Sequence, residues 1–161
     1  MTNHAQIKAN LARAICDDSA VRDFCVEHFG RGALVIVDWY GAQGVPGVKE
    51  APFVFIYSAD ENDAGFVDEE TFTVHVVCGG VSGSDKPDRS VHESRTATTN
   101  GIVVNGIAAE MEELRNLVEA VVVRGGLGAV ARTFTRVESS TAEWPLEWAK
   151  LNVEFFEPST M

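Results

Sequence analysis

The chain has 161 residues, of which 45% are apolar and 23% charged, so it is long and apolar enough to bury a core, and disorder of the whole chain is not expected. Its formal net charge of −11 argues against nucleic acid and anionic membrane surfaces as direct partners, because phosphates are held by clustered Lys and Arg. No apolar stretch reaches the length of about 18 residues that spans a membrane, and residues 1–8 lack the basic start and apolar core of a secretory signal.

The first predicted element is a helix over residues 5–29. Apolar side chains recur there at helical spacing and form two stripes. The stripes are interrupted at residues 17–19, where Ser19 is the expected N-cap of the second part. Gly30 is expected to end the helix.

Three strands are predicted to follow. Residues 33–39 are apolar and rich in β-branched side chains, which is typical of a buried strand. A loop containing glycine and proline separates them from the aromatic strand 53–57. Residues 71–78 alternate between apolar and polar faces, and we expect this strand to pair antiparallel with 53–57. The acidic connection at 59–70, which has no Lys or Arg, is expected to be solvated.

Residues 79–101 are predicted to be a mobile loop or arm. They are rich in glycine and polar residues, and compact domains seldom keep so long a loop unless it is functional or disordered. A helix is predicted next over 105–124, with a continuous apolar stripe and Asn105 able to cap its start. Two strands, 132–137 and 148–156, close the chain.

These elements predict a single α+β domain over residues 1–161. Two main amphipathic helices would pack as one layer on a mixed, mostly antiparallel sheet of about four to five strands. No internal repeat and no boundary between two domains is evident.

Cysteine and histidine chemistry is disfavoured. His75 and Cys78 have a spacing found in zinc sites, but about two more ligands would be needed, and His92 is the one conceivable third. Residues three apart in a strand point to opposite faces, and Cys78 lies on the apolar face, which also disfavours a Cys–His nucleophile. Together with Cys16 and Cys25, it is expected to be a reduced, packed thiol.

Three other segments resemble known site motifs but lack a residue or a structural context that the motif requires. Residues 80–84 half resemble a nucleophile elbow but lack its final glycine. Residues 125–128 follow a helix instead of preceding one, so they predict a turn and not a phosphate cradle. The acidic residues of 59–70 lack the regular alternation of a calcium-binding loop. We therefore predict no catalytic residue, no metal and no cofactor, and we do not expect an enzyme.

Two tryptophans stand out near the end of the chain. Trp144 and Trp148 flank a proline just before the last strand, and tryptophan is enriched in interface cores. The alternative that both simply cover the sheet stays open. Together with them, the polar side chains of the arm are predicted to contact other proteins, and these are Asp85, Lys86, Asp88, Arg89, His92 and Arg95.

This pattern resembles the tail terminator and related neck or tail-completion proteins of long-tailed bacteriophages. The likeness rests on an N-terminal helix that leads into a strand, a glycine- and proline-containing loop before an aromatic strand, and an alternating strand. A long helix after the arm follows, and then the acid-aromatic-proline step at residues 143–145 before the last strand. It extends over most of the chain as a pattern of elements.

The resemblance implies a virion structural protein, assembled in the bacterial cytoplasm, that forms a homo-oligomeric and commonly hexameric ring. Such a ring caps the tail tube and joins it to the head, so its partners would be further copies, the tail-tube protein and the neck or head-completion proteins. Sequence-specific nucleic acid and membranes would not be partners, and an acidic lumen would let DNA pass without adhering. The alternatives are a tail-tube or head–tail joining subunit and, from another class, a small-ligand-binding or enzymatic α+β domain.

Overall fold

A computed structural model of the chain describes residues 4–38, 46–58, 69–81, 96–99, 102–143 and 146–158. The first half contains α1 (His4–Asp17), α2 (Ser19–Phe29), β1 (Leu34–Val37), the short 3-10 helix η1 (Val48–Glu50) and β2 (Phe53–Ser58). It is followed by β3 (Glu69–Val81), β4 (Thr96–Thr99), β5 (Ile102–Asn105), α4 (Gly106–Arg124), β6 (Val130–Glu143) and β7 (Leu146–Pro158).

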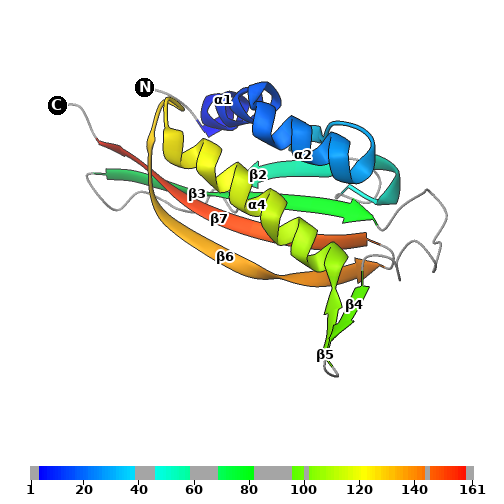
Figure 1. The fold of residues 1–161 in the computed structure, drawn as a ribbon. Coiled ribbons are helices and arrows are strands. Elements are labelled where there is room, and N and C mark those ends of the chain that lie inside the picture. The colour runs from blue at the N-terminus through cyan, green and yellow to red at the C-terminus, as the bar shows by residue number, and fades with distance from the viewer. Residues whose placement is uncertain are drawn as a thin grey trace.

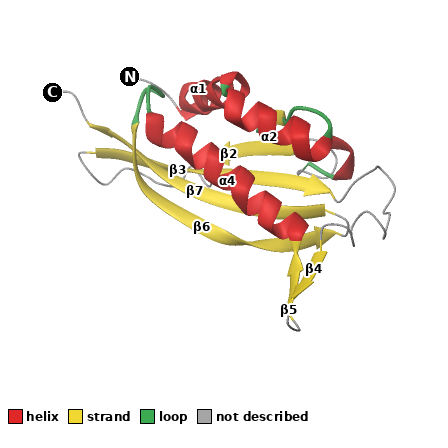
Figure 2. Ribbon diagram, viewed as in Figure 1, coloured by secondary structure: helices red, strands yellow, loops and turns green. Residues whose placement is uncertain are grey.

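Five strands form one mixed sheet in the order β1-β2-β3-β7-β6. β1 is parallel to β2, and all other neighbouring pairs in this sheet are antiparallel. The helices α1, α2 and α4 lie together against one face of the sheet (Figures 1 and 2). β4 and β5 form a separate hairpin. The α+β class and the antiparallel pairing of β2 with β3 are therefore confirmed.

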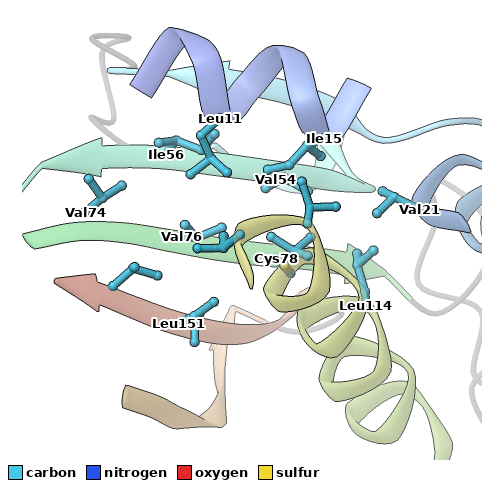
Figure 3. Packing of buried hydrophobic residues seen from close by; sticks show 14 of the residues in the cluster. Leu11, Ile15, Val21, Val54, Ile56, Val74, Val76, Cys78, Leu114 and Leu151 are labelled. Atoms are coloured by element: carbon cyan, nitrogen blue, oxygen red, sulfur yellow. The ribbon is translucent and has the colours of Figure 1, made fainter. Parts of the chain in front are cut away.

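The main core lies between the helices and the sheet (Figure 3). Leu11 of α1 and Leu114 of α4 are fully buried there, against Val54 of β2 and against Val76 and Cys78 of β3. The alternation predicted for β3 thus holds, since every second side chain enters this core. Burial of one such large apolar side chain contributes roughly 1.5–3 kcal/mol, so the layer contact is the main source of stability.

A second apolar cluster lies on the opposite face of the sheet, which we call the outer face. Its buried members are Ile36, Ala51, Phe53, Phe55, Val77, Val81 and Leu146. Phe53, Val54, Phe55 and Ile56 are all buried in succession, so β2 has apolar cover on both faces. That explains why its sequence is a continuous apolar run and not an alternating one.

The N-terminal helix of the prediction is divided in two, and its cap differs from the expected one. Asp18, and not Ser19, is the N-cap of α2: its backbone is extended, and its carboxylate accepts a hydrogen bond from the Val21 N–H at 2.9 Å. The same carboxylate accepts from the Arg124 guanidinium at 3.0 Å. Gly30 ends α2 in the left-handed conformation, as predicted, with φ of 80°.

Gly79 and Gly80 belong to β3 and not to the start of an arm, because the strand runs to Val81. A Cβ on Gly79 would overlap the ring of Phe53, and a Cβ on Gly80 would lie 2.6 Å from Cε of Met111. Side chains therefore press on this part of β3 from both faces. Glycine inside a strand is used where another group approaches the backbone this closely.

The remaining differences concern strand length. β4 lies within the segment predicted to be an arm, while residues 82–95, 100 and 101 of that segment are outside the described part of the chain. β6 has 14 residues, many more than the short strand predicted at 132–137, and it follows β7 with three register shifts. Residues 59–68 of the acidic connection also lie outside the description.

Candidate functional site

Trp148 is the one residue of the predicted contact set that the structure describes. The others lie outside the described residues, namely Asp85, Lys86, Asp88, Arg89, His92, Arg95 and Trp144. Trp148 lies on β7 opposite Gly79 and is half-buried against the outer-face cluster. Its indole Nε1 is buried and has no hydrogen-bond partner among the described residues. Trp148 thus helps to cover the sheet, and its role at an interface stays a prediction.

The outer face carries a row of polar and aromatic side chains across the sheet. Tyr57, His75, Asn152 and Thr135 lie opposite one another on β2, β3, β7 and β6. The Tyr57 and His75 rings stack with centroids 4.9 Å apart, and Nδ1 of His75 lies 2.6 Å from Oδ1 of Asn152. The row gives this side of the sheet a defined, partly polar surface.

The electrostatics of this row favour a neutral imidazole. Burial lowers the pKa of His75, and the nearby charge of Lys150 lowers it further, which together outweigh the opposite effect of the Asn152 hydrogen bond. Lys150 also lies over the Tyr57 ring, 5.6 Å from its centroid. Among the described residues, the group that hydrogen-bonds His75 is an amide and not a carboxylate.

His75 and Cys78 point to opposite faces of β3, as their spacing predicted: His75 lies on the outer face and Cys78 in the main core. Within the described residues no group of three His, Cys, Asp or Glu side chains is placed to hold a metal ion. Burial raises the pKa of the Cys25 thiol to about 11 and that of Cys78 to about 12. Both thiols are buried, as predicted.

Cys16 does not follow the prediction, because its thiol is exposed. It follows Ile15, the last buried residue of the apolar stripe of α1, and so points away from the core. Cys16 lines a hollow of about 260 Å³ beside the edge strand β1, together with Val21, Val26 and Arg22. The hollow is open to solvent and largely apolar.

Exposed apolar side chains are concentrated at the two edges of the sheet. Leu34 on β1 is 49% exposed, and on β6 Val130 is 58% and Val137 39% exposed. Val26, which lines the hollow beside β1, is 50% exposed. Val123 on α4 is the remaining large apolar side chain that is exposed in the described part of the chain. Apolar surface that is grouped in this way often marks a contact site.

One polar cluster was not anticipated from the sequence. The Lys8 ammonium donates to both Asp38 carboxylate oxygens, at 2.8 and 2.6 Å, and to Oγ of Ser58 at 3.1 Å. Asp38 follows β1 with a positive φ of 51°, and Ser58 ends β2. All three ammonium protons therefore have acceptors, and the cluster fastens α1 to the ends of the parallel strands. The sequence around Lys8 does not indicate these partners, because they lie far away in the chain.

Comparison of the sequence with models of protein families and with curated proteins gave no match. None of the helices in the described residues combines the length and apolar character needed to cross a membrane. The fold and the surface thus define a two-layer α+β domain whose sheet has two apolar edges and a partly polar outer face.

Proposed function

We propose that this chain is a structural subunit that assembles with further copies of itself into a ring. More specifically, we propose a tail terminator, which caps the tail tube of a long-tailed bacteriophage and joins it to the head in the virion. A tail-tube or head–tail joining subunit is the nearest alternative, because it would use the same features. The proposal depends above all on one element, the β4–β5 hairpin.

The β4–β5 hairpin projects from the body of the domain. Its strands pair over Thr96–Thr99 and Ile102–Asn105 and take no part in the five-stranded sheet. It leaves the domain at the start of α4 and points away from the sheet (Figure 1). A two-stranded hairpin is marginally stable by itself in water. A projecting hairpin gains stability when it packs on another molecule, which supports a role as an arm between subunits.

The charge of the chain is compatible with a ring through which DNA passes. At −11, several copies around a lumen would repel phosphates, so a passing strand would stay mobile. The tail-tube protein and the neck or head-completion proteins are the proposed partners on the two sides of the ring. The apolar sheet edges provide further contact surface for assembly.

The proposal is tested by the mass of the protein in solution. We expect light scattering coupled to size-exclusion chromatography to show a discrete oligomer that grows with concentration, and electron microscopy to show rings with a central opening. A variant in which residues 96–105 are replaced by a short Gly-Ser linker should assemble at least tenfold more weakly while it unfolds cooperatively like the parent. A chain that stays monomeric at high concentration would contradict the proposal.

A further inference from the structure

We infer that β6 of one copy pairs antiparallel with the outer edge of β1 of the next copy, so that the sheet continues from subunit to subunit. This inference rests on the proposed self-assembly and names the surface that carries it. β1 and β6 are the two outer strands of the five-stranded sheet. The outer side of an edge strand presents backbone groups that can accept another strand.

The first argument is the distribution of exposed apolar side chains. Four of the five large apolar residues that are exposed in the described chain lie on or beside these two strands: Leu34 and Val26 at the β1 edge, and Val130 and Val137 on β6. Leu34, Val130 and Val137 all lie on the outer face, as their partners Phe53, Phe156 and Lys150 show. Joining the two edges would bring Leu34 beside the outer face of β6, where Val137 lies in the regularly paired segment, while Val26 lies with the hollow on the helical side.

The second argument is the direction and length of the strands. β1 runs parallel to β2, and each of the next three pairs reverses direction, so β6 runs opposite to β1. A second copy with its helices on the same side therefore offers β1 to β6 in the antiparallel sense, the more stable pairing. Between its register shifts β6 keeps regular pairing over five residues, from Thr133 to Val137, which is long enough to pair with all four residues of β1.

The third argument is charge on the helical side of the two edges. Arg22 lines the hollow beside β1 and donates to the Cys16 carbonyl, without a carboxylate partner in the described residues. Glu119 of α4 pairs with Arg136 of β6 and so marks the β6 side of that helix, and Glu112 lies two turns earlier on the same side. Continuing the sheet brings Arg22 of one copy toward the β6 side of α4 in the next, where Glu112 lies and where Glu119 already pairs with Arg136, and it covers the hollow.

A contact that joins two different edges of the same chain is heterologous. When it is repeated, the copies form a closed ring if the rotation from one copy to the next divides a full turn into equal parts. Pairing of β6 with β6 across a two-fold axis would also be antiparallel. That arrangement would end at a dimer and leave Leu34, Val26 and the hollow exposed. The distribution of apolar surface on both edges therefore favours the heterologous contact.

The test uses one blocked edge in each variant. Leu34→Glu blocks the β1 edge, and the double substitution Val130→Glu/Val137→Glu blocks the β6 edge. Ala120→Glu introduces the same charge at an exposed apolar residue of α4, away from the side that Glu119 occupies, and is the matched control. Because each blocked variant keeps one intact edge, we expect each to be monomeric alone and their equimolar mixture to form dimers but no rings. The control should assemble like the parent.

Arg22→Glu provides a second variant that leaves the strands untouched, in case Leu34→Glu lowers the melting temperature. It should weaken assembly at least tenfold. Labelling of Cys16 should also be at least tenfold slower in the oligomer than in the monomer, because the next copy covers the hollow.

Dimers of Leu34→Glu alone, or rings formed by either blocked variant, would overturn the inference while the proposed assembly stands. A monomeric parent chain would overturn both.

Discussion

Gly79 is the residue at which the two apolar clusters constrain the backbone most directly. It pairs with Phe53 of the neighbouring strand, and the Phe53 ring lies where a Cβ of residue 79 would be. Gly79→Ala would push this fully buried ring out of place. Overpacking of a core typically costs about 1–3 kcal/mol, so we expect urea denaturation to show a free energy of unfolding lower by about 2 kcal/mol.

Gly32→Ala is the matched control, since no atom of the described residues lies within 4 Å of a Cβ at that position. It should leave stability unchanged or raise it slightly, because alanine reduces the freedom of the unfolded chain. Phe53→Leu, placed in the Gly79→Ala background, should recover part of the loss. Equal effects of the two alanine substitutions would show that the Phe53 ring does not require glycine at position 79.

Gly79 and its neighbour Gly80 also show which features could not be predicted from the sequence. A Gly79-Gly80 pair predicts flexibility when only its neighbours in the chain are considered. The groups that require these glycines, Phe53 and Met111, come from distant elements. Lys8 is similar, because its partners Asp38 and Ser58 are 30 and 50 residues away. Patterns of neighbouring residues in the sequence do not reveal contacts between distant segments. For this reason neither the glycines within β3 nor the cluster around Lys8 was predicted.

At the scale of elements, Asp18 joins the start of α2 to the end of α4. Burial alone would raise the pKa of its carboxyl, but the hydrogen bonds from the Val21 N–H and from Arg124 outweigh it, and the pKa lies below its ordinary value of 3.8. We expect Asp18→Ala to lower the free energy of unfolding by about 1–2 kcal/mol at pH 7, mainly through loss of the N-cap.

The pH dependence of that loss gives a second readout. A carboxyl whose pKa is depressed by folding stabilises the folded state above its unfolded pKa, and this stability is lost as the pH falls through the folded pKa. The difference between parent and Asp18→Ala should therefore be constant from pH 7 to about pH 5 and shrink below about pH 4. Asp17→Ala, at an exposed carboxylate, should change stability by less than about 0.5 kcal/mol. A pH-independent difference for Asp18→Ala would show that the charge of Asp18 is not involved.

The type and order of the elements were largely accessible from the sequence because they follow from periodicity. β3 and β7 alternate along most of their length, and the apolar stripe of α4 is continuous. The parallel pairing of β1 with β2 was not predicted, since an apolar run has no direction. The length of β6 was missed because its second half, residues 138–143, is polar and has no alternation of apolar side chains to indicate a strand.

At the scale of the whole molecule, the candidate surface depends on topology more than on any motif. The sheet order makes β1 and β6 the edges, and that order was not predictable from the strands alone. Of the residues chosen from composition, only Trp148 falls on the described surface. Leu34, Val130 and Val137 attract no attention in the sequence, because an exposed valine is recognisable only once its neighbours are known.

The three cysteines offer a test of whether both layers unfold as one unit. Cys16 is exposed, while Cys25 of α2 and Cys78 of β3 are buried in the same core, with pKa values raised to about 11 and about 12. The thiolate is the reactive form. In dilute native protein we therefore expect a thiol reagent to label only Cys16 rapidly, and Cys16→Ser to abolish this fast reaction.

In urea, Cys25 and Cys78 should become reactive together, with the denaturant dependence of global unfolding, because exposure of either thiol requires separation of the helices from the sheet. Labelling of Cys25 well before Cys78 would mean that α2 detaches by itself and that the two layers are not a single cooperative domain.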